Sequence, residues 1–375
     1  MLKPRQIFPL GKAYGEAFCN RTEETKELIG HIENGKHTFL VAPRRYGKSS
    51  LCERAFEKID CAWAKMDFHL AVTDKDAERI IINGVIDLIN KSMGSASEKL
   101  MLIIKKYAKK LQPKLAMGSE YFKLELTFMD NSSPAENIAE ALMILEKLLK
   151  EKNKQAVFLL DEFQEVGIIE NGRSIEGAIR SVAQETQHLA FIFCGSNPHL
   201  LKTMFEDERR PLYKLCRKLV LDRITEDHYK IHLNKAFKAI WGQSLEPAVF
   251  DKIMSLSERH PYYVNYLCDV LCSLCEEAPT LQDIDQAWDR VVEEERSDLI
   301  KDFSSLSNNQ KRLMIYIATH EGSAIYSAET ARKTEMPTGS ISRILSSLIE
   351  KDYLEKISEN YRLITPVYKK ILSAS

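Results

Sequence analysis

One segment, residues 38–51, constrains the fold of this chain more than any other. It begins with an apolar run, turns at Ala42 and Pro43, and continues through Gly47-Lys48-Ser49 into a helical pattern. A strand, a tight loop and a helix in this spacing indicate a phosphate-binding loop, because backbone N–H groups and a helix start together surround a polyanion. We expect a nucleotide to contact the residues of this loop: Pro43, Arg44, Arg45, Tyr46, Gly47, Lys48, Ser49 and Ser50.

Three loop residues have separate expected roles. Gly47 lets the main chain approach the phosphates, Lys48 supplies a positive charge to the β and γ oxygens, and Ser49 offers a hydroxyl to Mg²⁺. The first position of the usual pattern is Ala42 instead of glycine. A Cβ is accommodated there only if φ stays below zero. Because a short Gly-Lys-Ser sequence can also occur by chance at a helix start, the assignment depends on a second motif.

The second motif is an apolar run at 156–160 that is followed directly by Asp161 and Glu162. Such a run predicts a strand buried on both faces of a parallel sheet. Two adjacent carboxylates fit only at the exposed C-terminal end of that strand, where open α/β sheets bind ligands. We expect Asp161 to hold Mg²⁺, mostly through water, and Glu162 to polarise the attacking water. The alternative, a strand end with an acidic turn, weakens once Lys48 is considered.

Two further segments carry candidate catalytic residues. An apolar strand pattern at 189–194 ends in small polar residues, of which Asn197, in preference to Ser196, would touch the γ-phosphate or orient water. A simple turn accounts for the same residues equally well. Arg210 is a candidate for an arginine that stabilises charge on a nucleotide in a neighbouring subunit, although surface arginines are the commoner explanation.

Charge and cysteine usage exclude some classes of protein. The chain has 53 Lys+Arg and 54 Asp+Glu, so no global signature of polyanion binding is present. Eight cysteines are scattered along the sequence, without a secretory signal or a membrane-length apolar run. We therefore expect reduced thiols in a cytoplasmic protein that makes no membrane contact. Cys268, Cys272 and Cys275 share one helical face, which favours a core stripe over a metal site.

The pattern of elements predicts an α/β core at residues 1–224. Strand patterns recur through this region, at 62–68, 121–128, 155–161, 189–194 and 215–221, and residues 75–112 have a helical pattern with a lysine-rich face. The long separation between Lys48 and Asp161 leaves room for an additional strand between the two motifs. In P-loop proteins that strand marks the class whose catalytic glutamate follows the Mg²⁺ aspartate. Residues 225–303 are predicted to form an all-helical lid.

Residues 304–375 predict a winged helix-turn-helix domain, with helices at 308–318, 327–334 and 340–351 followed by a short hairpin. Its presumed recognition helix exposes Ser340, Ser342, Arg343 and Ser346. Residues 305–375 carry ten Lys+Arg against seven Asp+Glu. That excess is mild for a DNA-binding domain, because non-specific affinity scales with the number of phosphates neutralised. Contact with duplex DNA and contact with a protein therefore both stay open.

Taken in order, these motifs resemble those of archaeal-type ATPases in the STAND and origin-recognition-like branch of the AAA superfamily. The matching segments run from Phe18-Cys-Asn-Arg21 through the loop, the acid pair, Cys-Gly-Ser-Asn, Arg-Pro-Leu-Tyr and His-Pro-Tyr-Tyr to the winged helix. The resemblance spans nearly the whole chain. It implies an ASCE-type P-loop NTPase core, with a parallel sheet flanked by helices, then a helical lid and a winged helix. By position, it assigns adenine contacts to Phe18 and Arg21, a sensor role to Asn197 and an arginine-finger role to Arg210.

These inferences predict a Mg²⁺-dependent ATPase that acts as a molecular switch. Mg·ATP would hold the core against the lid, and slow hydrolysis would release the winged helix or change the oligomeric state. One alternative is an ATP-regulated DNA-binding regulator or initiator-like loader. Another is a signalling scaffold that oligomerises on ATP. Salt-dependent duplex binding by residues 305–375 would favour the former, and ATP-induced assembly without DNA would favour the latter.

Overall fold

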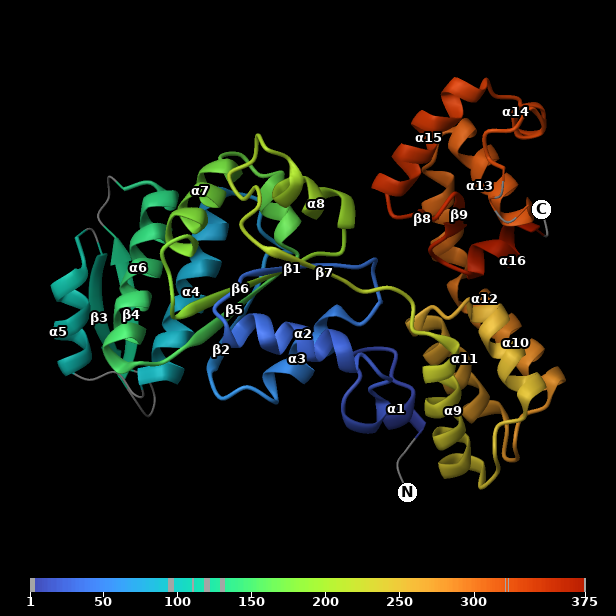
Figure 1. Cartoon of the computed structure of the whole chain (residues 1–375), viewed down its shortest axis with the longest axis horizontal. Helices are drawn as coiled ribbons and strands as arrows, with labels where there is room; N and C mark the ends of the chain where they lie inside the picture. Colours follow the sequence, from blue (N-terminus) through green and yellow to red (C-terminus); the bar gives the residue numbers. More distant parts are fainter. Residues whose placement is uncertain are drawn as a thin grey trace. The chain divides into compact units, whose positions relative to one another are not determined.

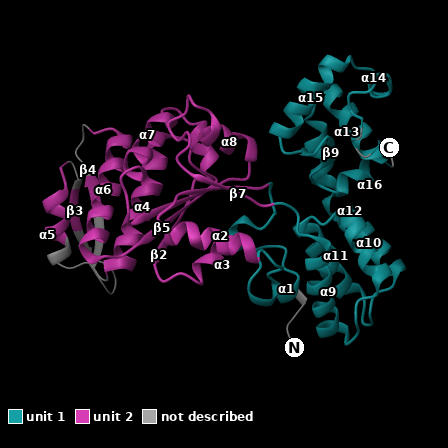
Figure 2. Ribbon diagram, in the orientation of Figure 1, with its two compact units in different colours: residues 1–21, 43–50, 222–375 teal, residues 22–42, 51–221 magenta. Residues whose placement is uncertain are grey.

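The structure is a computed structural model that describes residues 4–93, 98–109, 111–117, 122–128, 132–320, 322 and 324–373. The chain forms two compact units, each considered by itself (Figure 2). Unit 1 comprises residues 1–21, 43–50 and 222–375, and unit 2 comprises residues 22–42 and 51–221. The phosphate-binding loop at 43–50 therefore belongs to unit 1, whereas the strand before it belongs to unit 2.

Unit 2 is built on a five-stranded parallel sheet with the order β2-β5-β6-β1-β7. Its strands are β1 (Thr38–Val41), β2 (Ala62–Asp67), β5 (Ala156–Asp161), β6 (Leu189–Cys194) and β7 (Arg217–Val220). β1, β5 and β6 are buried along their whole length, as their apolar runs predict. The strand that separates β1 from β5 in space is β6, which follows both motifs in the sequence. β2, which lies between the motifs in the sequence, is at the edge of the sheet.

Helices cover both faces of this sheet. Figure 1 shows α4, α6 and α7 on one face and α2 on the other. The described α-helices of unit 2 are α2 (Thr22–Glu33), α4 (Asp74–Met93), α5 (Glu98–Tyr107), α6 (Pro134–Lys152), α7 (Gly172–Ala183) and α8 (Pro198–Glu206), with the end of α3 (Lys48–Phe56). A capping box of Ser133 and Glu136 begins α6, because the two residues satisfy each other's free N–H groups. The predicted α/β fold, a parallel sheet flanked by helices, is confirmed.

A second, two-stranded sheet lies outside the main one. It pairs β3 (Leu111–Met117) with β4 (Phe122–Phe128) in antiparallel register. The pattern predicted at 121–128 is therefore a hairpin arm, and Tyr121 lies outside the described residues. The continuous helical pattern expected at 75–112 is wrong at its end, since α5 (Glu98–Tyr107) is followed by β3. Pro113 agrees with the strand, because a proline disfavours the helical conformation at the residue before it.

Unit 1 contains the helical and winged-helix elements expected from the sequence. Its helical part has α9 (Glu226–Trp241), α10 (Pro247–Ser257), α11 (Pro261–Leu274) and α12 (Leu281–Ser304). The C-terminal part has α13 (Asn308–His320), α14 (Ala328–Thr334), α15 (Thr338–Glu350), β8 (Leu354–Ile357), β9 (Asn360–Leu363) and a further helix, α16 (Val367–Ser373). Short elements α1 (Pro4–Ile7) and η1 (Gly15–Ala17) precede them. The division into domains at 224 and 303 stays a prediction.

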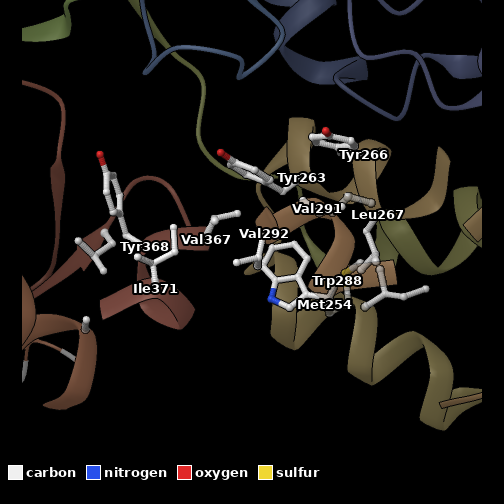
Figure 3. Close-up of a cluster of buried hydrophobic side chains, with 14 of the residues drawn as sticks. Met254, Tyr263, Tyr266, Leu267, Trp288, Val291, Val292, Val367, Tyr368 and Ile371 are labelled. Atoms are coloured by element: carbon white, nitrogen blue, oxygen red, sulfur yellow. The ribbon is translucent and has the colours of Figure 1, made fainter. Parts of the chain in front are cut away.

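The helical part and the winged helix share one hydrophobic core. In Figure 3, Trp288 and Val292 of α12 lie in the same cluster as Val367 and Ile371 of α16. The hydroxyl of Tyr368 donates a hydrogen bond to the carbonyl of Leu299 over 3.2 Å. Because burial of this apolar surface is favourable only while the two parts stay packed, we expect them to move together. None of the described helices is long and apolar enough to cross a membrane.

Candidate nucleotide site

The phosphate-binding loop has the backbone geometry that its spacing predicts. Gly47 has φ +89°, a conformation that side-chain-bearing residues rarely adopt. Ala42 is not among the described residues with positive φ, so its Cβ is tolerated. Lys48 begins α3 and is 9% exposed, and its ammonium donates a hydrogen bond to the carbonyl of Pro43 over 2.9 Å. The backbone of the loop therefore folds back on the side chain of its own lysine.

Arg45 is the loop residue under backbone strain, with φ +62°. A non-glycine residue in this region needs support from its surroundings. Its guanidinium pairs with Glu295 over 3.3 Å and lies 4.0 Å from the centre of the Tyr262 ring. Both partners come from the helical part, α11 and α12. An anion at the loop would therefore compete with Glu295 for Arg45, whereas Arg44 is exposed.

The N-terminal segment lies along the same loop. Arg21 is buried and donates hydrogen bonds to the carbonyls of Tyr46, over 3.4 Å, and Asp222, over 2.5 Å. The N–H of Ala13 donates to the hydroxyl of Ser50 over 3.0 Å. Phe18 is half-buried at the end of η1. The segment that carries Phe18 and Arg21 is therefore attached to the loop, and the adenine contacts assigned to these two residues stay a prediction.

Arg223 connects the loop to the winged helix. It is 5% exposed, and its Nε donates to the hydroxyl of Tyr46 over 2.9 Å. Its Nη2 pairs with Glu355 of β8 over 2.7 Å. The guanidinium also donates to three carbonyl oxygens, those of Glu258 at 2.6 Å, Leu363 at 3.2 Å and Ile364 at 3.1 Å. A planar fork of five donors is suited to hold several acceptors at once, so Arg223 is the centre of this polar cluster.

Tyr46 is the loop's own contribution to that cluster. It is 1% exposed, and its hydroxyl donates to Glu355 over 3.2 Å. Burial is the main cause that raises the pKa of Tyr46, so the hydroxyl keeps the proton it donates. The ring stacks edge-on against His260, 4.9 Å between centres. Burial, and the charges of Arg223 and Arg45, hold the pKa of His260 well below its usual range, so this imidazole is neutral.

In unit 2, Asp161 ends β5 at the carboxyl edge of the sheet, as expected. The ammonium of Lys65, on β2, lies 2.7 Å from its carboxylate. Burial lowers the pKa of Lys65, but the hydrogen bonds and charges of Asp161 and Asp67 together outweigh burial and leave the pKa raised. Within the described part of the chain, no group of three or more His, Cys, Asp or Glu could hold a metal ion. The carboxylate of Asp161 and the hydroxyl of Ser49 each offer an oxygen ligand of the kind that Mg²⁺ takes when phosphates and water complete its coordination shell.

Glu162 follows with an unusual backbone, φ 52° and ψ 37°. Its Oε2 accepts hydrogen bonds from the N–H of Ser196 over 3.1 Å and from the Ser196 hydroxyl over 2.7 Å. It also accepts one from Nε2 of Gln164 over 2.7 Å. β5 and β6 are neighbours in the sheet, and this is why the residues after them meet.

Asn197 and Arg210, the other predicted catalytic residues, have structural contacts in unit 2. Asn197 caps α8, where its Oδ1 accepts a hydrogen bond from the N–H of Leu200 over 3.0 Å. The Arg210 side chain is 11% exposed and pairs with the fully buried Glu176. Burial raises the pKa of Glu176 to about 7, and Arg210 opposes this shift. The sensor role of Asn197 and the arginine-finger role of Arg210 stay predictions.

Sequence reasoning missed Arg223, Glu355 and Gln164. Arg223 follows the strand pattern at 215–221 and stands with Asp222 between the apolar residues Leu221 and Ile224, which is a weak signal of a buried charge. Glu355 and Gln164 carry no signal of this kind, because acidic and amide side chains in strands and turns are usually solvent-exposed.

Solved structures are similar to this one over 95% or more of its length. It matches the Walker-type ATPase of Pyrococcus abyssi with a TM-score of 0.69 and 17% identity, over 98% of this chain and 99% of that one. It also matches the ORC2 protein of Aeropyrum pernix, solved as ADPNP-ADP complexes, with a TM-score of 0.55 and 12% identity, over 95% of each chain. No protein-family model and no curated protein matches the sequence. The likeness confirms the predicted fold, a parallel sheet flanked by helices with a helical C-terminal part, which these solved structures share.

Proposed function

We propose that this chain binds and slowly hydrolyses Mg·ATP, and that the bound nucleotide controls the position of its winged helix. Three features support nucleotide binding: the backbone of loop 43–50, the helix start at Lys48, and the acid pair that ends a strand of the same sheet as β1. The fold shared with Walker-type ATPases agrees with this activity.

Each residue of the proposed site has one task. Lys48 and the loop N–H groups bind the β and γ phosphates, and release of Lys48 from the Pro43 carbonyl accompanies their binding. Ser49 and Asp161 would hold Mg²⁺, which would supply charge neutralisation on the phosphate oxygens. Glu162 accepts a hydrogen bond from the attacking water and takes its proton. Phe18 and Arg21 would contact the adenine from the segment that is attached to the loop.

The observation that supports nucleotide control of the winged helix is the hydrogen bond between Tyr46 of the phosphate-binding loop and Glu355 of β8. We call the β8–β9 hairpin the wing. A ligand shifts a conformational equilibrium only through contacts that differ between the two states. Phosphates drawn into the loop would move Tyr46 and Arg45, and each of these residues holds an acidic partner elsewhere in unit 1. We therefore expect nucleotide binding to loosen β8 and β9.

Tyr46→Phe tests this coupling. The variant keeps the ring that packs against His260 and loses the hydroxyl between Arg223 and Glu355. We expect it to bind Mg·ATP with an affinity within about threefold of the parent, since the loop backbone is unchanged. Hydrogen exchange of the β8 and β9 amides should be about tenfold faster without nucleotide and should no longer respond to Mg·ATP.

The matched control is Tyr326→Phe, which removes a winged-helix hydroxyl that bonds Tyr361 over 3.1 Å. In this control the amides of β8 and β9 should respond to Mg·ATP as in the parent. If Tyr46→Phe also keeps the full response, the loop does not control the wing, and the switch proposal is wrong even if ATP is hydrolysed.

Duplex DNA is a second candidate partner, favoured by the exposed face of α15. Ser342, Arg343 and Ser346 are exposed there, and Ser340 is half-buried. The decisive experiment follows ATP turnover with and without duplex DNA, together with the mass of the protein in solution. If DNA binds through α15, Arg343→Ala should weaken binding and lower the slope against log salt by about one. Assembly on ATP without DNA would favour the scaffold alternative instead.

A further inference from the structure

The hydrogen bonds at Glu162 lie at the proposed hydrolytic centre and have no role in the nucleotide contacts described above. All three donors, two from Ser196 and one from Gln164, converge on the same oxygen, Oε2. Three hydrogen bonds from two rigidly placed residues leave that oxygen with a single defined position. The left-handed backbone of Glu162 further restricts where its side chain can point.

Gln164 is held in place by close packing beneath the end of β6. It is 3% exposed, and a Cβ on Gly195 would overlap its Oε1. That Oε1 is buried and has no hydrogen-bond partner among the described residues. A buried acceptor without a partner is costly, and such costs persist where an arrangement serves a further purpose. The amide instead directs its Nε2 donor at Glu162 over 2.7 Å, and the same nitrogen also donates to Glu165 over 3.1 Å.

Ser196 and Asn197 have different roles in the turn after β6. The side chain of Asn197 accepts a hydrogen bond from the backbone and thereby begins α8, whereas the hydroxyl of Ser196 donates to the carboxylate. The link is not required by the turn itself, since the turn's backbone can form with any small residue at 196. A hydroxyl here is explained by the carboxylate that it contacts.

We infer that Ser196, supported by Gln164, is a positioning residue that holds the Glu162 carboxylate in the orientation needed to accept a proton from the attacking water. This inference rests on the proposed ATP hydrolysis and names a residue that influences its rate by positioning Glu162. Displacing a catalytic group by about 1 Å can slow a reaction by up to roughly a hundredfold, because the water and base must be aligned. Substrate binding does not depend on that alignment.

Ser196→Ala in the full chain tests the inference. We expect kcat for ATP hydrolysis to fall about tenfold, less than the full loss on removing the base, because the Ser196 N–H still donates. KM and the affinity for Mg·ATP should stay within about twofold. Ser196→Thr keeps a hydroxyl and should recover most of kcat. Gln164→Leu, which removes the other donor, should also lower kcat at constant KM.

The matched control is Ser181→Ala, which removes a hydroxyl that donates to the Ala178 carbonyl of its own helix. It should leave kcat and KM unchanged. In a Glu162→Gln background, Ser196→Ala should add nothing to the loss, since both changes act on one group. Unchanged or faster turnover in Ser196→Ala, or an equal loss in Ser196→Thr, overturns the positioning role. If Glu162→Gln itself hydrolyses ATP like the parent, the proposed function fails first, and the two failures are distinguished.

Discussion

Lys48→Ala is expected to abolish useful binding of Mg·ATP. The ammonium is the charge that meets the β and γ phosphates in the proposed site, and loss of a charge-assisted contact of this kind costs roughly 3 kcal/mol, or about a hundredfold in Kd. Calorimetric titration of the purified chain with ATP and Mg²⁺ measures the change. Since Lys48 also donates to the Pro43 carbonyl, the fold of the variant should be checked by circular dichroism.

Two comparison variants make this result specific. Lys58→Ala removes an exposed lysine that closely follows α3, and it should bind Mg·ATP like the parent. Glu162→Gln should retain nucleotide affinity and lower turnover by about a hundredfold or more, because the amide cannot take a proton from water. Parent-like hydrolysis in both Lys48→Ala and Glu162→Gln would show that the nucleotide site lies elsewhere.

Arg223→Ala is expected to have the largest effect on stability. Its removal takes one of two arginines from the Glu355 carboxylate, which keeps Arg362 at 2.8 Å, and takes a buried donor from the Tyr46 hydroxyl and three carbonyl groups. Breaking a buried ion pair by removing one partner costs roughly 3–5 kcal/mol, and we expect a value near the lower end because Arg362 still pairs with Glu355. Hydrogen exchange of the β8 and β9 amides measures this local loss, and it should rise by two to three orders of magnitude, at about 1.4 kcal/mol per tenfold.

Arg259→Ala is the matched control for that prediction. Arg259 is partly exposed and pairs with Glu226 at 4.0 Å, so its loss should cost less than about 1 kcal/mol. Arg223→Lys keeps the charge without the planar fork and should give an intermediate result. Equal effects of Arg223→Ala and Arg259→Ala would mean that the buried cluster does not hold the wing.

The predicted fold followed from short windows of sequence. The apolar runs of β1, β5 and β6 are long enough to be recognised as buried strands, and Asp161 and Glu162 stand where such a strand must end. The helical pattern at 75–112 failed after Tyr107, where β3 begins at Leu111, because the apolar spacing of a short segment fits helix and strand alike. The final helix, α16, also escaped prediction, since seven residues show too little periodicity.

The candidate site was predictable only in part. The residues of the loop and of the acid pair are neighbours in sequence, and their spacing alone indicates phosphate chemistry. The partners of these residues are distant in the sequence. Arg223 bonds to Tyr46 of the loop, 177 positions away, and Ser196 bonds to Glu162, 34 positions away. No local pattern encodes a pairing of that kind.

The amino-acid sequence by itself determined the loop at 43–50, the strand ends that carry acids and the order of α/β, helical and winged-helix parts. These features depend on backbone propensity and apolar periodicity, which act between near neighbours along the chain. Only the tertiary structure decided that Tyr46 bonds to Glu355, that Ser196 holds Glu162 and that the helical part shares a core with the winged helix. Those contacts arise when packing brings remote segments together and most buried polar groups find a partner there.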